Sequence, residues 1–170
     1  MRSYSIPNYI RYKEDIKAKL KRLPDKPYNE YTREELIIKF LPLVENLARK
    51  FPSGQQASGI MNIMDFIQEG SKGLTRAVDR IDWHMLLQSD DIEKTLKSFL
   101  SKRIRGAIRR GIDANRGTMR IPEHKLNEIR RDFGKDRKAV EMFFNSIFLS
   151  IDVPSDDTDM VYDIPDKSEL

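Results

Sequence analysis

Cationic side chains gather in one stretch of this chain, from Leu96 to His124. The stretch contains eight lysines and arginines but only two acids, Asp113 and Glu123. Its cations are Lys97, Lys102, Arg103, Arg105, Arg109, Arg110, Arg116 and Arg120. Cations at this density neutralise phosphate groups, so the chemistry that the stretch predicts is binding to a nucleic-acid backbone.

An amphipathic helix is the element expected to position these cations. At helical periodicity, one stripe of the stretch is apolar and would face a core. The stripe consists of Leu100, Ile104, Ala107, Ile108 and Ile112. The opposite half is cationic, so we expect a helix with one buried face and one face available to a polyanionic partner.

Phe99 breaks this division, because it projects to the cationic side. It lies beside Lys102 and Arg103, and Gly106 and Arg110 follow on the same face. An aromatic ring among guanidinium groups can stack on a base while the cations neutralise phosphates, and such stacking contributes about 1–3 kcal/mol per base. The alternative is an ordinary solvated face with one exposed phenylalanine. The local charge density favours a site for single-stranded nucleic acid.

The distribution of charge is more informative than its total. The net charge is only +4, whereas residues 150–170 contain seven acids and one lysine. This asymmetry predicts a nucleic-acid-binding face together with an acidic tail. The chain contains no cysteine, which excludes a disulfide framework and thiolate chemistry. No apolar run approaches the roughly 20 residues of a membrane span, and a secretory pattern is absent, so we expect a cytoplasmic protein.

Two further helices are expected before this stretch. A short amphipathic helix over Tyr9 to Leu23 is predicted either to dock on the main domain or to contact a partner. Thr32 and Glu35 form a capping-box pattern that begins the next helix. Pro42 interrupts its apolar stripe, so we expect that helix to kink or restart there. Residues 52–59 have the composition of a flexible link.

The helix expected between this link and the cationic stretch has three faces. Its core positions are Met64, Ile67, Leu74, Val78 and Ile81. A second stripe, in which small residues would let another helix approach closely, contains Phe66, Gly70, Gly73 and Ala77. Core packing does not explain the outward polar residues, among them Asp65, Gln68, Glu69 and Lys72. Such residues are usually solvated surface.

Two motifs in this order resemble the sigma-70 family of transcription initiation factors. Residues 65–82 read DFIQEGSKGLTRAVDRID, which resembles the family's core-polymerase-binding helix. Residues 98–124 read SFLSKRIRGAIRRGIDANRGTMRIPEH and are similar to its promoter-melting and promoter-reading helix, with the family's Arg-Ile-Pro-x-His ending. The resemblance covers Leu36 to His124. It implies an all-α fold, a helical bundle of the sigma region 2 type with a short C-terminal helical extension and an acidic tail.

The resemblance implies a role for each face. In the family, the first motif grips the clamp of the polymerase's largest subunit, which would place the core-polymerase contact on Asp65, Phe66, Gln68, Glu69 and Lys72. The aromatic that stacks on the flipped adenine of the minus-ten element corresponds to Phe99. The non-template strand would be held there, so the implied partners are core RNA polymerase and promoter DNA, both duplex and single-stranded.

Several positions depart from the family pattern. The paired tryptophans that wedge the melted DNA are replaced by Lys102 and Arg103, so melting would use cations and their stems or depend on a partner. The two readers of the upstream base pair correspond to Gly106 and Arg109, and Arg109 could reach a guanine edge or a phosphate. Phosphate contacts are implied for four arginines, Arg105, Arg110, Arg116 and Arg120. His124 matches a residue near the spacer DNA.

The expected organisation has four parts: an N-terminal amphipathic segment (1–31), a region 2-like domain (32–124), short region 3-like helices (125–149) and an acidic tail (150–170). The tail faintly resembles the family's acidic loop that inserts toward the polymerase active site. A disordered acidic tail is the rival interpretation, and a calcium loop is a third, although its glycine and terminal glutamate are missing. We expect a factor without the module that reads the upstream promoter element. This shortened plan resembles the late-promoter sigma factors of large tailed phages, which use separate co-activators.

Two other classes of function remain open. A sigma-domain mimic that occupies the polymerase clamp and inhibits or redirects host transcription would need the first motif but not Phe99. A metal-dependent nuclease would require clustered carboxylates on ordered elements, whereas the acids here gather in a tail. His84 is isolated, so we expect it to be structural or at the surface rather than a metal ligand. We therefore expect a binding protein without a cofactor or metal, not an enzyme.

Overall fold

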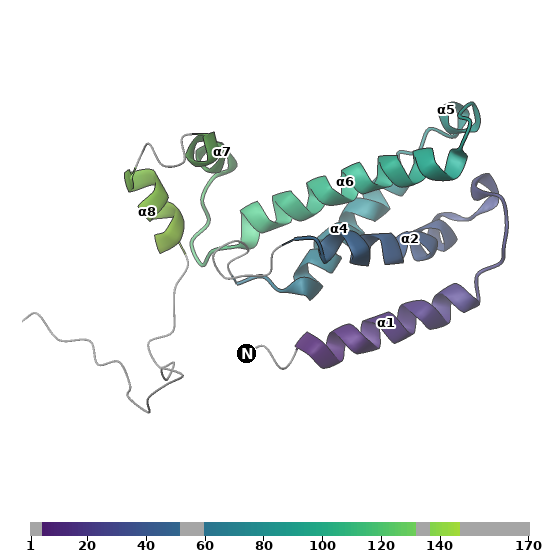
Figure 1. Ribbon diagram of the computed structural model, residues 1–170, viewed down its shortest axis with the longest axis horizontal. Coiled ribbons are helices and arrows are strands. Elements are labelled where there is room, and N and C mark those ends of the chain that lie inside the picture. Colours follow the sequence, from purple (N-terminus) through teal and green to yellow (C-terminus); the bar gives the residue numbers. More distant parts are fainter. Residues whose placement is uncertain (1–4, 52–59, 132–136, 147–170) are drawn as a thin grey trace, which may run out of the picture.

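The computed structural model describes residues 5–51, 60–131 and 137–146, and in these ranges all regular secondary structure is helical. The prediction of an all-α fold is confirmed. The elements are α1 (Ser5–Lys21), a 3-10 turn (Tyr28–Glu30), α2 (Arg33–Ala48), α4 (Ile63–Val78), α5 (Trp83–Leu87), α6 (Ile92–Asn115), α7 (Glu123–Arg131) and α8 (Arg137–Asn145). Figure 1 shows α6 as the longest helix, with α4 and α2 along one side and α7 and α8 beyond its C-terminal end.

Side-chain caps determine where the central helices begin. The predicted capping box of α2 is confirmed, because the Glu35 amide donates to Thr32 Oγ1 (3.3 Å) and the Thr32 amide donates to Glu35 Oε2 (2.9 Å). A second capping box starts α4, where the Asn62 amide donates to Asp65 Oδ2 at 2.8 Å. Such reciprocal caps satisfy amide groups that the first turn of a helix leaves unpaired.

The predicted break at Pro42 does not produce a restart. The helix α2 runs without interruption from Arg33 to Ala48, with Pro42 inside it. The missing amide removes one backbone hydrogen bond. Packing supplies the compensation, because Phe40, Val44 and Leu47 on both sides of the proline are buried in the core.

The core lies where α4 packs between α2 and α6. The predicted apolar stripe of α6 supplies Leu100, Ile104 and Ile108, all 0% exposed. The small-residue stripe of α4 allows the close approach that its composition predicted. A Cβ atom added at Gly73 would lie 2.4 Å from Ala107 Cβ, and one at Gly70 would lie 2.7 Å from Val44 Cγ1. No side chain fits at either position without displacing a neighbouring helix.

The N-terminal helix α1 docks on α2 through polar contacts and one buried apolar residue. The Tyr9 hydroxyl donates to Glu45 Oε1 at 2.5 Å, and Lys13 Nζ lies 3.5 Å from the same carboxylate oxygen. Ile16 is 6% exposed. This contact agrees with the docked alternative for this segment, although the helix begins at Ser5 rather than near Tyr9.

The last two helices lie at the C-terminal end of α6 (Figure 1). Arg130 of α7 forms a bidentate ion pair with Asp113 of α6, including an Nη1–Oδ2 distance of 3.0 Å. Leu126 and Ile129 of α7 are buried. The acidic tail, residues 150–170, lies outside the described residues. No helix in the described part of the chain is long and apolar enough to cross a membrane.

Candidate nucleic-acid interface and protein-docking face

The outward side of α6 carries a continuous row of cations, here called the cationic face. It consists of Lys102, Arg103, Arg105, Arg109 and Arg110, all of them exposed. None of these five forms an ion pair with another residue that the structure describes. The buried leucine and isoleucines on the opposite side of α6 fix the orientation of this face. Because the apolar side of α6 is buried, the five cations face solvent, where a polyanion can reach them.

Phe99 lies at the edge of the cationic face. Its ring is half-buried and packs partly against the core cluster, and the guanidinium carbon of Arg103 lies 5.5 Å from the ring centroid. A cation near the face of a ring is attracted to it electrostatically. The predicted neighbourhood of an aromatic ring and guanidinium groups therefore exists in the folded chain.

A shallow hollow of about 720 Å³, open to solvent, adjoins Phe99. Its other lining residues come from the connector after α5 and the first turns of α6: Gln88, Ser89, Asp90, Asp91, Lys94, Thr95 and Ser98. Amide, hydroxyl and carboxylate groups of this kind can hydrogen-bond the edge of a base that stacks on the ring.

Sequence reasoning missed this hollow. Residues 83–94 lie between the two motifs, and the structure folds them into α5 and the capped start of α6. The Asp91 side chain accepts the Lys94 amide at 2.9 Å and so fixes the first turn. The available signal was the N-cap pattern at Asp91.

Gly106 lies on the outward side of α6 with open space above it. A Cβ atom added there would meet nothing closer than Arg110 Nη1, at 3.9 Å. Packing therefore does not require glycine at this position, in contrast to Gly73. The bare backbone lets a ligand approach α6 closely between Arg103 and Arg109.

The predicted phosphate contacts at the end of α6 have different surroundings. Arg120 and His124 are exposed in the loop after α6 and in the first turn of α7. Arg116 is only 4% exposed, and its guanidinium carbon lies 3.3 Å from the centroid of the Phe143 ring. Arg116 is therefore not at the surface in this structure, because Phe143 of α8 covers the side chain, and its phosphate contact stays a prediction.

The outward residues of α4 form a second surface, here called the docking face: Asp65, Gln68, Glu69 and Lys72. Gln68 and Lys72 are exposed. Lys72 Nζ donates to Glu69 Oε1 at 2.6 Å, and the Glu69 stem packs where a Cβ at Gly111 would lie only 2.5 Å from it. Surface ion pairs of this kind add little stability. The Lys72–Glu69 pair therefore contributes little to the fold, whereas the Glu69 stem takes part in the packing of α4 on α6.

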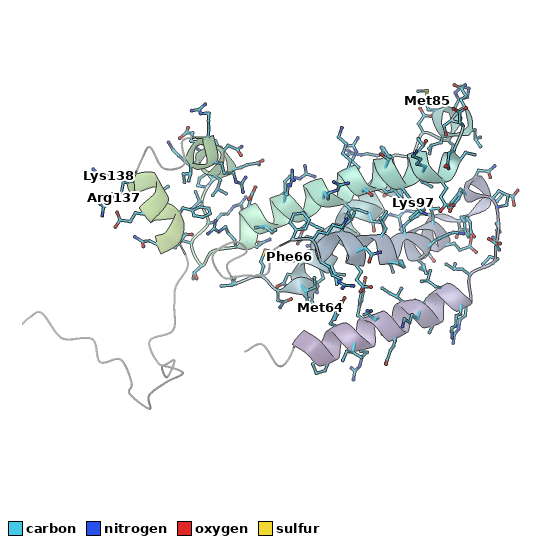
Figure 2. The ribbon with its side chains drawn as sticks, viewed as in Figure 1. Met64, Phe66, Met85, Lys97, Arg137 and Lys138 are labelled. Atoms are coloured by element: carbon cyan, nitrogen blue, oxygen red, sulfur yellow. The ribbon has the colours of Figure 1, made fainter. Side chains whose placement is uncertain are left out.

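Phe66 does not belong to the docking face, and its predicted contact with a partner is wrong. The side chain is 0% exposed. Figure 2 labels it among the packed helices. Its ring lies 6.2 Å from the ring of Phe51, on the side of α4 that faces the other helices. The small residues that share its stripe bring the neighbouring helices so close that Phe66 fills the core between them.

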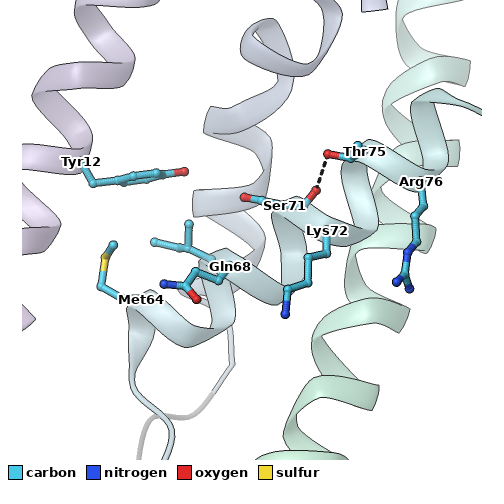
Figure 3. A pocket seen from close by; sticks show the side chains of 8 residues that line it. Tyr12, Met64, Gln68, Ser71, Lys72, Thr75 and Arg76 are labelled. Atoms are coloured by element: carbon cyan, nitrogen blue, oxygen red, sulfur yellow. Dashed lines mark hydrogen bonds between the residues drawn. The ribbon is translucent and has the colours of Figure 1, made fainter. Parts of the chain in front are cut away.

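Two hollows flank the docking face. One, of about 220 Å³, is lined by Ile60, Met61, Asp65, Gln68, Glu69 and Asn115. The other, of about 630 Å³, lies between α1 and α4 and is lined by Tyr12, Met64, Ile67, Gln68, Ser71, Lys72, Thr75 and Arg76 (Figure 3). Met64 was predicted as a core residue, but it is half-buried and lines this hollow. Burial raises the pKa of Tyr12 to about 12, with the charge of Glu45 as the second cause.

Among the described residues, no group of three or more histidines, aspartates or glutamates is placed to hold a metal ion. The ionisable side chains are instead distributed over helix surfaces and caps. The arrangement offers charge, stacking and hydrogen bonding, which are the means of recognition by binding.

Comparison with known proteins shows where the sequence has relatives. No protein-family profile matches the chain. It is 32% identical over 103 residues to the RNA polymerase principal sigma factor HrdD of Streptomyces coelicolor, covering 61% of this chain and 27% of that protein. The HrdD proteins of Streptomyces viridifaciens and Streptomyces griseus are each 32% identical, over 123 and 102 residues. All three are principal sigma factors.

These alignments cover 66% and 60% of this chain for the second and third relatives, and 33% and 27% of those proteins. The chain therefore spans about a third or less of the length of the sigma factors that it matches. This similarity agrees with the resemblance noted in the two motifs. The phage-type specificity suggested by the sequence is not part of what the relatives show.

Proposed function

We propose that the chain is a sigma-type initiation factor that works by binding rather than by bond chemistry. The docking face of α4 would contact the clamp of core RNA polymerase, and the cationic face of α6 would capture promoter DNA. The observation that carries this proposal is the position of Phe99 near the Arg103 guanidinium group, at the edge of five exposed cations and beside a shallow surface hollow. The similarity to principal sigma factors supports it independently.

Strand separation would follow from differential binding of the two DNA states. The cationic face can hold duplex phosphates, but a paired base hides its faces from Phe99. Extruding a base costs a few kcal/mol of unstacking. Stacking on an aromatic returns about 1–3 kcal/mol, and hydrogen bonds in the adjacent hollow add to this. The melted strand therefore gains contacts that the duplex lacks, and the polymerase would supply the remainder.

The surroundings of Lys102 and Arg103 support a dependence on a partner for melting. Arg103 is engaged over the Phe99 ring, so it stabilises the stacking platform instead of presenting a free wedge. Lys102 is exposed and has a flexible stem. Neither residue offers a rigid flat surface against the edge of a melted duplex. A premelted template or a separate co-activator would therefore increase the activity of this chain more than it would increase the activity of a factor that carries paired tryptophans.

Sequence preference would differ from the usual minus-ten element. Gly106 presents no side chain, and the space above it is open. Arg109 is exposed and can donate two hydrogen bonds to a guanine edge, which contributes about 1–3 kcal/mol of discrimination. We therefore infer a preference for a G·C pair at the upstream position, read by Arg109 alone.

A binding experiment on the assembled complex tests the proposal. Core polymerase carrying the chain is titrated with a labelled single-stranded non-template oligonucleotide and with the corresponding duplex. We expect retention of the single strand to need both proteins, and Phe99→Ala to reduce it while the exposed control Ile10→Ala does not. Core polymerase that fails to bind the chain, or a Phe99→Ala variant with unchanged retention, would contradict the proposal.

A clamp-blocking mimic is the second candidate, and one observation favours it. The docking face and its two flanking hollows are complete without any residue of the cationic face. A blocker would displace a resident sigma factor from core polymerase and inhibit transcription. The variants Phe99→Ala and Arg105→Ala would leave that inhibition intact but would cripple an initiation factor, which separates the two functions.

A further inference from the structure

Arg116 combines deep burial with an incomplete set of partners. Its side chain is 4% exposed, and Nε and Nη2 have no hydrogen-bond acceptor among the residues that the structure describes. The neighbouring carboxylate, Asp113, is already engaged by both terminal nitrogens of Arg130. A buried guanidinium without an anion is costly, because each unpaired donor loses its hydration.

The cover over Arg116 is formed by the end of α8. The Phe143 ring lies 3.3 Å from the guanidinium carbon, and the Met119 amide donates to the Ser146 carbonyl at 3.2 Å. The fit is tight at Gly117, where an added Cβ would lie 2.8 Å from the Ser146 carbonyl oxygen. The cation–π contact is attractive, but it satisfies no N–H group.

The contact between Arg116 and Phe143 therefore leaves the guanidinium group able to bind an anion if α8 moves away. Burial, followed by the nearby charge of Arg130, lowers the pKa of Arg116, which shows how poorly this environment suits the cation. A phosphate oxygen would satisfy the two free donors with charge-assisted hydrogen bonds. Arg116 directly follows α6, at the C-terminal end of the helix that carries the cationic face, where a nucleic-acid backbone running along α6 would arrive.

We propose that Arg116 is a covered phosphate-binding residue, and that displacement of α8 from Phe143 to Ser146 exposes it to the nucleic-acid backbone. This inference rests on the proposed function. It adds that DNA and α8 compete for one side chain, so the free chain binds DNA more weakly than its charges allow. The apparent affinity is the intrinsic affinity multiplied by the fraction of molecules in which Arg116 is uncovered.

A double-mutant cycle tests the coupling in the full chain bound to core polymerase, with a labelled single-stranded oligonucleotide as the probe. Phe143→Ala removes the cover and is expected to tighten binding by about tenfold, the equivalent of one charged hydrogen bond. Arg116→Gln is expected to weaken binding and reduce the salt slope by about 0.7. In the Arg116→Gln background, Phe143→Ala should give no gain.

Two further variants serve as controls for the effect of Phe143→Ala. Gly117→Ala pushes the Ser146 end of α8 away without touching the ring and should reproduce the gain of Phe143→Ala. Met142→Ala changes an exposed residue of the same helix, 46% exposed, and should leave binding unchanged. Thermal unfolding of each variant confirms that the chain remains folded.

Modification by an arginine-specific reagent, followed by peptide mapping, measures how accessible Arg116 is in the absence of DNA. Arg116 should react slowly in the unmodified chain and quickly in Phe143→Ala, with exposed Arg120 as the internal reference. Equal gains from Phe143→Ala in both Arg116 backgrounds, or equal reactivity of Arg116 with and without Phe143, would overturn the inference. Loss of oligonucleotide binding by the unmodified complex would instead contradict the proposed function.

Discussion

The guanidinium group of Arg103 lies over the ring of Phe99, with 5.5 Å between the guanidinium carbon and the ring centroid. One residue of the pair belongs to the cationic face and the other reaches into the core cluster. The core contact fixes the ring, and the cation keeps it beside the phosphate-binding groups. A base that stacks on Phe99 would therefore meet a preorganised platform, which reduces the entropy lost on binding.

Removal of this ring should affect single strands selectively. We expect Phe99→Ala to weaken single-stranded binding by about 5- to 150-fold, the equivalent of 1–3 kcal/mol of stacking. Phe99→Trp should retain binding, and duplex affinity should change little. Fluorescence quenching of a base analogue in the oligonucleotide measures the stacking directly. Arg105→Ala is the matched contrast, because it should weaken binding to both the single strand and the duplex. It should also reduce the slope of log K against log salt concentration for the duplex by about 0.9.

The docking face should tolerate substitution at Gln68 without loss of stability. Gln68 is exposed at the centre of this face and borders both hollows. We expect Gln68→Arg to weaken binding to core polymerase at least tenfold, because a new charge must be desolvated at the contact. Asn46→Arg, on the exposed side of α2, is the control. Co-purification that is unchanged by Gln68→Arg but lost in Asn46→Arg would place the contact elsewhere.

Two glycines offer a matched pair for the close packing of α4 on α6. Gly73→Ala should destabilise the fold by about 1–3 kcal/mol, because its Cβ would overlap Ala107 and the helices must separate. Gly106→Ala faces open space and should stabilise the helix by about 1 kcal/mol. Urea unfolding monitored by circular dichroism measures both. A Gly73→Ala chain as stable as the parent would mean that α4 and α6 are not as close as the structure places them.

Burial of Tyr12 should make stability depend on alkaline pH. Burial raises the pKa of Tyr12 to about 12, above the value of about 10 for an unfolded tyrosine. The folded state therefore retains a proton that the unfolded state loses, so stability is fully present below pH 10 and declines as pH rises toward 12.

Tyr12→Phe removes this ionisation and should reduce the decline. Tyr28 has a pKa raised to about 12 as well, by burial and then by a hydrogen bond with Glu93, so Tyr28→Phe should remove a further part. Unfolding midpoints measured between pH 9 and 12 test both variants. Identical pH profiles for Tyr12→Phe and the parent chain would contradict the burial of this hydroxyl.

Periodicity and caps predicted most of the architecture, because they depend on neighbours in sequence. The apolar stripe of α6, the capping box at Thr32 and the small-residue stripe of α4 all have the expected roles. Pro42 shows the limit of such reasoning, since tertiary packing holds α2 together across a residue that locally disfavours a helix. Local preference is a weak prior when the core compensates for it.

The candidate site was less predictable wherever distant segments meet. Phe66 was assigned to a partner surface through its motif, but the glycines in its own stripe bring other helices over it. Arg116 was assigned to the phosphate-binding surface through its motif. Nothing in the local sequence indicates that α8 folds back and covers it. The hollow beside Phe99 depends on how the α5–α6 connector folds. Each of these features requires a contact between elements that sequence order does not specify.

Runoff transcription tests the central claim most directly. Core polymerase and this chain are combined on a template with only a minus-ten element, once as duplex and once with a premelted bubble. We expect chain-dependent transcripts from the bubble, weaker activity on the duplex, and loss of both in Phe99→Ala. Silence on both templates, together with tight core binding and inhibition of transcription by a resident sigma factor, would contradict an initiation factor and identify a clamp blocker.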